Sequence, residues 1–246
     1  MNYREYGAGN ARTIILLHGG GLSWWNYREE AALLEGDFHV VLPILDGHAG
    51  SDRDFTTIGD NAAELVDFIG ARLGGGVDLI GGLSLGGQVL LEALARRGDI
   101  CRYALIESVC VVPSRLTARM VGPALDCSYG LIKHEWFSRL QFRALGIREA
   151  LFDDYFRDSR AITKRNMAAF LRASSEYALN DGLRAATARA RVFVGGREDP
   201  RMQVSARLIR DALPACEMEV LPGWAHGAFS LNHAEAYAAR VREILR

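Results

Sequence analysis

Short apolar runs alternate with helical patterns along most of this 246-residue chain, and this alternation constrains the fold more than any other feature. The predicted strands are residues 13–17, 39–42, 77–80, 103–106, 191–194 and 217–221, with 1–6 as a weaker antiparallel edge strand. Strands that are connected by crossover helices pair in parallel. The sequence therefore predicts an α/β fold with a mainly parallel sheet.

Apolar residues at helical spacing predict three of the connecting helices. Their predicted buried faces contain Leu65, Val66, Ile69 and Leu73 in the first, Val204, Leu208, Ile209 and Leu213 in the second, and Tyr237, Val241, Ile244 and Leu245 in the third.

The alternation breaks between Pro113 and Gly182, where no strand is predicted and many charged and aromatic residues occur. A structureless loop of that length inside a compact domain would be unusual, so we expect a helical cap over residues 113–182. Residues 1–112 and 183–246 would form one α/β core, because 246 residues with 49% hydrophobic content suit a single large domain.

The composition favours a small-molecule partner. The formal net charge is −1, from 29 basic and 30 acidic residues that are dispersed along the chain, so nucleic acid and stable membrane association are not expected. The composition leaves open whether the protein forms a homo-oligomer. Residues 1–7 contain no apolar signal core and no stretch suits a bilayer span, which predicts a cytoplasmic protein. The four cysteines are widely separated, so we expect reduced structural cysteines and no metal site.

The segment Gly82-Leu83-Ser84-Leu85-Gly86 follows a predicted strand and precedes a helical pattern. A serine on a sharp strand-to-helix turn is exposed to a substrate, and glycines two residues to either side avoid steric collision. The helix N-terminus would also favour negative charge that develops near the serine. We therefore predict Ser84 as a nucleophile.

A serine nucleophile needs a base, and His226 is the predicted one. It lies in a loop between the last predicted strand and the last predicted helix. His39, His134 and His233 fall in a strand, in the helical insertion and at a helix start, where structural or exposed roles are expected.

The base in turn needs a carboxylate that fixes its tautomer. Asp199 follows the strand at 191–194, and Pro200 favours an extended conformation for it. We expect Asp199 to be this acid, because the order serine, acid, histidine is usual for such a fold. Glu107, after the strand at 103–106, is the second candidate, and Glu198 is expected to point elsewhere.

Two backbone N–H groups would complete an oxyanion hole. The residue after the nucleophile, Leu85, supplies one. The strand at 13–17 runs into His18-Gly19-Gly20-Gly21, where Gly20 is the preferred second donor and Gly21 the alternative. We expect His18 to brace this loop.

All these candidates follow predicted strands at their carboxyl ends, where open parallel sheets bind ligands. The predicted substrate pocket is framed by Trp24 and Trp25 after the glycine-rich loop and by Trp224 beside His226, with aromatic residues of the cap.

On these motifs the chain resembles the α/β-hydrolase superfamily, in its serine esterase and lipase-like branch. The resemblance includes His18-Gly19, the segment Asp46-Gly47-His48-Ala49-Gly50-Ser51, the turn at Ser84 and the loops of Asp199 and His226. It implies an eight-stranded, mostly parallel sheet with a cap inserted after the sixth strand. It also implies that Asp46 and His48 stabilise a loop. Two departures are Ala225, where the family usually has glycine, and Leu83, where histidine is common.

The function that this resemblance implies is hydrolysis of an ester-type bond in a small, largely apolar substrate through an acyl-enzyme, without a cofactor. Hydrolysis of a carbon–carbon bond, a thioester or a lactone would use the same residues. A lyase, a cofactor-free haloperoxidase-like enzyme and a non-catalytic ligand receptor also stay open, because one fold can host several functions. Dehalogenases and epoxide hydrolases are disfavoured, because they have aspartate at the nucleophile position.

Overall fold

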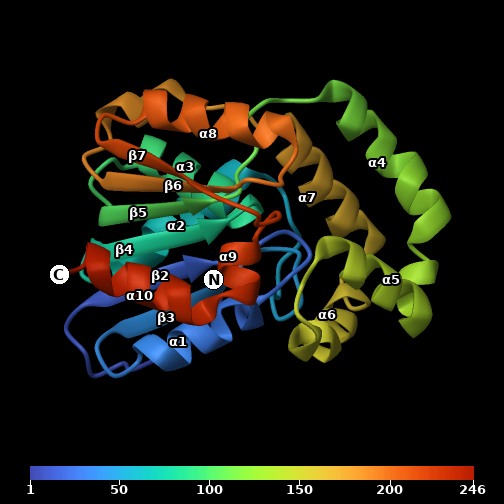
Figure 1. The fold of residues 1–246 in the computed structure, drawn as a ribbon, viewed down its shortest axis with the longest axis horizontal. Coiled ribbons are helices and arrows are strands. Elements are labelled where there is room, and N and C mark those ends of the chain that lie inside the picture. Colours follow the sequence, from blue (N-terminus) through green and yellow to red (C-terminus); the bar gives the residue numbers. More distant parts are fainter.

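The computed structural model describes residues 1–246 and contains one seven-stranded sheet in the order β1-β3-β2-β4-β5-β6-β7 (Figure 1). Its strands are β1 (Asn2–Tyr6), β2 (Thr13–Leu17), β3 (His39–Ile44), β4 (Val77–Leu83), β5 (Cys101–Glu107), β6 (Arg189–Gly195) and β7 (Cys216–Leu221). Strand β1 pairs antiparallel with β3, and all other neighbours pair in parallel. Every strand predicted from the sequence is confirmed, but the sheet has seven strands and not the eight that the resemblance implied.

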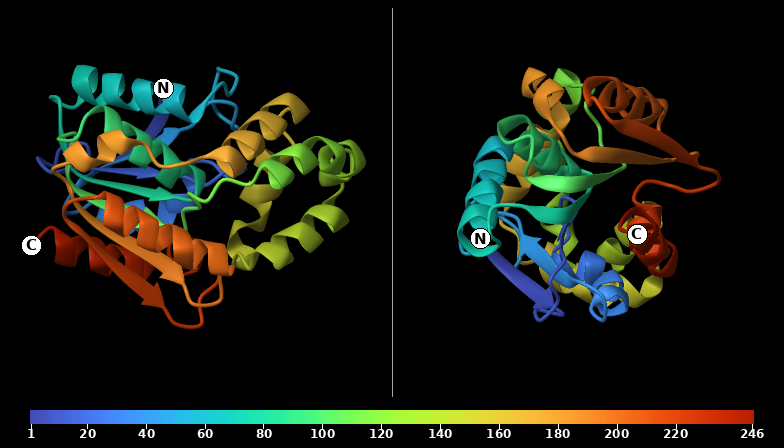
Figure 2. Two further views of the ribbon diagram at one scale, coloured as in Figure 1. Left: turned by 90° about the horizontal axis from the view of Figure 1, so that it is seen from above. Right: turned by 90° about the vertical axis from the view of Figure 1, so that its left-hand side faces the viewer.

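Helices cover both faces of the sheet, which twists strongly when viewed from its end (Figure 2). One face packs against α2 (Ile58–Arg72), α3 (Leu85–Arg96) and α8 (Pro200–Ala212), and the other against α1 (Arg28–Leu34), α9 (Ala228–Asn232) and α10 (Ala234–Ile244). Successive side chains of a strand point to opposite faces. In β2, accordingly, Ile15 and Leu17 join the first core while Ile14 and Leu16 join the second.

The predicted buried face of α8 is partly wrong. Val204 and Leu208 are each 44% exposed, whereas Met202, Ala206 and Ile209 are buried. The predicted Ile209 and Leu213 are buried, so the buried stripe is rotated toward Met202 and Ala206 relative to the predicted one.

The segment from 113 to 182 forms a helical layer beyond the carboxyl ends of the strands (Figure 1). It contains α4 (Arg115–Ser128), η2 (Leu131–Lys133), α5 (Glu135–Leu145), η3 (Glu149–Leu151), α6 (Phe152–Ser159) and α7 (Lys164–Glu176), and η4 (Asp181–Ala185) leads back to β6. The layer follows β5, the fifth strand of this chain and not the sixth. Phe142, Phe152 and Phe170 are buried in the two cores, so these aromatic residues attach the layer to the sheet domain.

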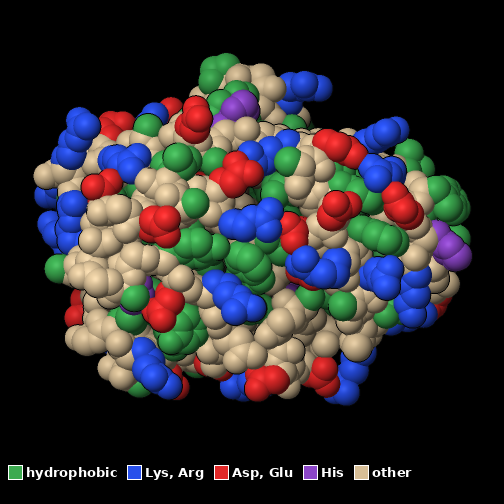
Figure 3. Space-filling view, turned by 90° about the horizontal axis from the view of Figure 1, so that it is seen from below, with side chains coloured by type: hydrophobic (Ala, Val, Ile, Leu, Met, Phe, Trp, Pro, Cys, Tyr) green, Lys and Arg blue, Asp and Glu red, His purple; other side chains and the backbone are tan.

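Charged side chains of both signs are interspersed with hydrophobic ones on the face drawn in Figure 3. None of the helices combines the length and the apolar character needed to cross a lipid bilayer.

Candidate active site

Ser84 occupies the sharp turn between β4 and α3, with φ 51° and ψ −111°. A Cβ atom on Gly82 would lie 2.6 Å from the carbonyl oxygen of Gly86, and one on Gly86 would overlap the carbonyl oxygen of Leu17. The turn therefore requires glycine at both positions, as the sequence predicted. The Ser84 N–H donates to the carbonyl oxygen of Glu107 at 2.9 Å, which fixes the turn to the end of β5.

Ser84 and His226 line the same cavity, whose volume is about 450 Å³. Glycines of the loop after β2 form part of its wall. The apolar side chains of the lining are Leu22, Leu83, Ala144, Leu145, Ile147, Ala225 and Leu231. Ala144, Leu145 and Ile147 come from the end of α5 and the residues after it, so the helical layer contributes one side of the cavity.

His226 is bonded to Glu198 and not to Asp199. The distance between His226 Nδ1 and Glu198 Oε2 is 2.8 Å. A carboxylate can only accept, so Nδ1 carries a proton, and in the neutral imidazole the lone pair is therefore at Nε2. The His226 side chain is 48% exposed, whereas that of Glu198 is fully buried. The expectation that Glu198 points elsewhere is wrong.

The carboxylate of Glu198 receives two further hydrogen bonds, both at Oε1. The hydroxyl of Ser108 donates from 2.8 Å and the N–H of Gly195 from 2.5 Å. Burial raises the pKa of Glu198, but the hydrogen bond and the charge of His226, with the other two donors, outweigh burial and hold the pKa below its ordinary value. Glu198 is therefore an ionised acceptor at neutral pH.

Asp199 instead caps the N-terminus of α8. Its carboxylate accepts from the N–H of Arg201 at 2.8 Å and pairs with the Arg201 guanidinium at 3.2 Å. Asp before Pro at the first helical position is a favoured helix start, and this preference directs Asp199 toward the helix and into solvent. The sequence Asp199-Pro200 thus contained a signal that Asp199 is a helix cap and not the partner of His226.

Glu107, the second candidate acid, is also not bonded to His226. Its Oε1 accepts from the N–H of Ser230 at 3.2 Å, and its Oε2 has no hydrogen-bond partner. Burial raises the pKa of Glu107 to about 7. Glu107 is buried and is not among the residues that line the cavity, so its place in the interior suits a neutral carboxyl group better than a partner of the imidazole.

The two predicted oxyanion donors lie close together. Leu85 is the first residue of α3, so its N–H has no partner within the helix. A Cβ atom on Gly20 would lie 3.6 Å from Cβ of Leu85, and the Gly20 N–H makes no hydrogen bond within the chain. Both N–H groups are thus available to a bound oxygen.

His18 braces the loop that carries Gly20. Its Nε2 accepts from the N–H of Leu45 at 3.1 Å, so its Nδ1 carries the proton and donates to the Gly19 carbonyl oxygen at 2.9 Å. Burial, with a smaller effect of the neighbouring His48 ring, lowers the pKa of His18 to about 3. His18 is therefore neutral and structural.

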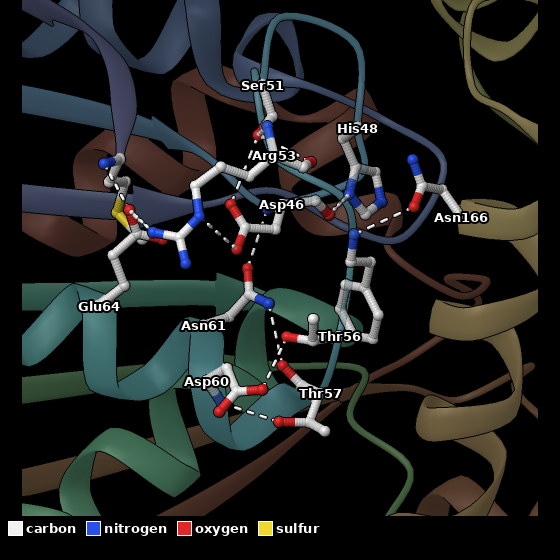
Figure 4. Close-up of polar contacts among 12 residues, drawn as sticks. Asp46, His48, Ser51, Arg53, Thr56, Thr57, Asp60, Asn61, Glu64 and Asn166 are labelled. Carbon is white, nitrogen blue, oxygen red and sulfur yellow. Dashed lines mark hydrogen bonds and ion pairs between the residues drawn. The ribbon is translucent and has the colours of Figure 1, made fainter.

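Asp46 and His48 hold the loop after β3 (Figure 4). The N–H of Asp46 donates to Asn61 Oδ1 at 2.9 Å, and His48 Nδ1 donates to the Asp46 carbonyl oxygen at 3.0 Å. The guanidinium of Arg53 lies 3.7 Å from the Asp46 carboxylate and 3.1 Å from Glu64. These contacts are internal to the loop and the start of α2.

None of the three tryptophans predicted to frame the pocket lines the cavity beside Ser84. Trp25 is 1% exposed, and its Nε1 donates to the buried Asp158 of α6 at 2.8 Å. Trp24 lies beside the guanidinium groups of Arg4 and Arg28 on the surface. Trp224 stacks on the ring of His233, with 4.0 Å between the centroids. Each indole has a packing partner away from the cavity, which leucine, isoleucine and alanine side chains line instead.

The structure contains no group of three or more His, Cys, Asp or Glu side chains that could hold a metal ion. The groups that the cavity and its surroundings offer to a substrate are the Ser84 hydroxyl, the His226 imidazole with its carboxylate partner, free backbone N–H groups, and the charged side chains of Arg197 and Asp199, which also line the cavity.

Solved structures share this fold. An esterase from Exiguobacterium antarcticum superposes with a TM-score of 0.83 at 17% identity, covering 99% of this chain and 94% of that one. The enol-lactonase from Burkholderia xenovorans LB400 superposes with a TM-score of 0.81 at 16% identity, covering 99% and 95%. At such identities the likeness concerns the fold alone.

Sequence comparison gives the family. A curated relative from Gibberella zeae, an AB hydrolase superfamily protein, is 30% identical over 148 residues, which are 57% of this chain and 49% of the relative. The chain thus spans about half the length of that relative. Residues 14–240 match the sequence model of the Alpha/beta hydrolase family. Since this match covers nearly the whole chain, the protein belongs to the alpha/beta hydrolase family.

Proposed function

We propose that this protein is a serine hydrolase that cleaves an ester of a small, largely apolar acid. The observation that carries the proposal is the bond between His226 and the buried, ionised Glu198, at a cavity that Ser84 also lines. This pair leaves His226 Nε2 to act as the base toward the hydroxyl of Ser84, which lines the same cavity.

In the proposed reaction, His226 Nε2 takes the proton of Ser84 as its oxygen attacks the ester carbonyl carbon. Glu198 stabilises the resulting imidazolium through Nδ1. The N–H groups of Leu85 and Gly20 stabilise the negative oxygen of the tetrahedral intermediate. His226 then gives the proton to the leaving alcohol. In the second half of the reaction, His226 takes a proton from the water that attacks the acyl-enzyme, and it returns this proton to the oxygen of Ser84 as the acid is released.

The apolar part of the lining supports a small acyl group as the preferred occupant, while Arg197, Glu198 and Asp199 also line the cavity. Contact between a hydrocarbon chain and the leucine, isoleucine and alanine side chains removes apolar surface from water, which favours binding. These side chains offer no hydrogen-bond partner to a polar group. A cavity of about 450 Å³ is within the range for small-molecule sites.

The test is labelling with a fluorophosphonate probe, followed by hydrolysis of aryl esters of increasing acyl length. Wild-type protein should be labelled and Ser84→Ala should not. Short to medium aryl esters should turn over faster than long ones. Matched thioesters, lactones and a vinylogous diketone in the same panel separate ester hydrolysis from the related reactions that would use the same residues. A wild-type protein that resists the probe, or equal labelling of Ser84→Ala, would refute the proposal.

A further inference from the structure

Ser108 is, with Ser84, one of the two non-glycine residues with positive φ in the chain. It directly follows β5, has φ 53° and is 2% exposed. Residues other than glycine, asparagine and aspartate rarely adopt this left-handed conformation. It is energetically unfavourable for them and persists where surrounding contacts enforce it. The other such residue is the proposed nucleophile, so the conformation of Ser108 calls for an explanation.

The Ser108 hydroxyl connects the two loops that carry the acid and the base. It donates its only proton to Glu198 Oε1 at 2.8 Å and accepts from the N–H of Gly227 at 3.1 Å. Gly227 directly follows His226 in the chain. The N–H of Ser108 donates to the carbonyl oxygen of Phe193 in β6 at 2.9 Å, which anchors its backbone to the strand before the acid loop.

We propose that Ser108 is a positioning residue that holds Glu198 and His226 in register through one hydroxyl group. This inference rests on the proposed function. The hydroxyl fixes Glu198 Oε1, which leaves Oε2 directed at His226 Nδ1, and it fixes the backbone beside His226 at the same time. The left-handed backbone of Ser108 places the hydroxyl between the two loops.

Two variants separate the hydroxyl from the backbone. Ser108→Gly removes the hydroxyl and adopts a positive φ without strain, and Ser108→Ala removes the hydroxyl while the strain remains. The matched control is Ser205→Ala in α8. Ser205 is likewise fully buried, and its hydroxyl accepts from the N–H of Val111 at 3.0 Å, but it has no contact with Glu198 or His226.

Both Ser108 variants should lower kcat for an aryl ester by about 10- to 100-fold, the usual effect of losing a hydrogen bond to a buried charge, with KM within about twofold. The acid limb of the profile of kcat/KM against pH reports protonation of the base, and it should move to higher pH by about half a unit, because a Glu198 carboxylate with one donor fewer stabilises the imidazolium form of His226 more strongly. Ser205→Ala should reduce thermal stability but leave the shape of this profile unchanged.

A second readout needs no substrate. The His226 Nδ1–H that is bonded to a buried carboxylate should give a far-downfield proton NMR resonance at low temperature, which His226→Gln assigns. Ser108→Gly should shift or broaden this resonance, and Ser205→Ala should not.

The outcomes separate the two proposals. If wild-type protein labels with fluorophosphonate while Ser108→Gly and Ser108→Ala keep the wild-type kcat, pH profile and resonance, the inference on Ser108 is overturned. Activity losses that follow thermal stability equally in Ser108 and Ser205 variants would overturn it as well. If the resonance responds to Ser108→Gly but the wild type resists the probe, the proposed function fails and the link between the two loops stands.

Discussion

Two buried glutamates near the carboxyl ends of adjacent strands have opposite protonation behaviour. The side chain of Glu198, in the loop after β6, is fully buried, accepts from three donors, and has a pKa held below its ordinary value. Glu107, the last residue of β5, is also buried but accepts from one backbone N–H, and its pKa is raised to about 7. Burial raises the pKa of both carboxyl groups, so the hydrogen-bond donors and the charge of His226 beside Glu198 decide which one is an anion.

The surroundings of Glu107 extend this contrast. Glu30 of α1 is fully buried with no partner for either carboxyl oxygen, and burial raises its pKa well above the ordinary value. The hydroxyls of Tyr27 and Tyr237, which are also buried here, lack partners too. The interior around Glu107 therefore holds polar groups that burial keeps neutral, whereas Glu198, in the loop after β6, is a stabilised charge.

The largest test of this contrast is Glu198→Gln. A glutamine keeps the shape of the side chain but not its charge, so it neither fixes the productive tautomer of His226 nor stabilises the imidazolium. We expect kcat/KM for an aryl ester to fall by roughly 10³- to 10⁴-fold, by analogy with the acid of other triads. Glu107→Gln is the control and should stay within about tenfold of wild type. A larger loss for Glu107→Gln than for Glu198→Gln would reverse the assignment of the acid.

The second test concerns stability and pH. The pKa of Glu107 is raised from 4.5 to about 7, so the folded state holds a proton that the unfolded state has released between these values. Its contribution to stability is therefore fully present below pH 4.5 and is lost as pH rises through about 7.

In Glu107→Gln this loss should be absent. The free energy of unfolding of the variant relative to wild type should rise by about 3 kcal/mol between acid and weakly alkaline pH. Urea unfolding of both proteins across this range measures the difference. A constant difference would mean that Glu107 does not titrate differently in the folded and unfolded states.

The smallest test is Asp199→Asn. Asn is also a good helix cap, so α8 should begin at the same place, and the exposed pair with Arg201 should contribute little. Activity should stay near wild type and the melting temperature should change slightly. Ester turnover and thermal denaturation check both expectations, and a loss similar to that of Glu198→Gln would restore Asp199 as the acid.

The fold was predictable because its signals are local. Apolar runs indicated the strands of the parallel part of the sheet, the expectation of a weaker antiparallel edge strand at residues 1–6 is confirmed by β1, and the break after β5 indicated the helical layer. The strand count was wrong since it came from the family resemblance and not from a run of residues. The face of α8 was partly wrong because its packing against β6 and β7 buries Met202 and Ala206 in place of Val204 and Leu208, a choice that the spacing of the apolar residues does not show.

The site was predictable in part for the same reason. Ser84 and His226 follow strands whose ends meet at one edge of the sheet, and both line the cavity. The expectation for Asp199 over Glu198 was wrong because adjacent loop residues point to different sides, and the capping preference of Asp199 before Pro200 turns its carboxylate toward α8. The tryptophans were misplaced because a large side chain follows its available packing partners, which sequence position does not show.

The sequence by itself determined the α/β class, the glycine-flanked turn at Ser84 and the positions of Ser84, His226 and Gly20 at strand ends, because periodicity and backbone sterics act within a few residues. Only the tertiary structure decided that Glu198 partners His226, that Ser108 joins the two loops and that Glu107 favours its neutral form. Those properties depend on donors from separate loops and on burial by distant elements. Such contacts exist only once the chain has folded.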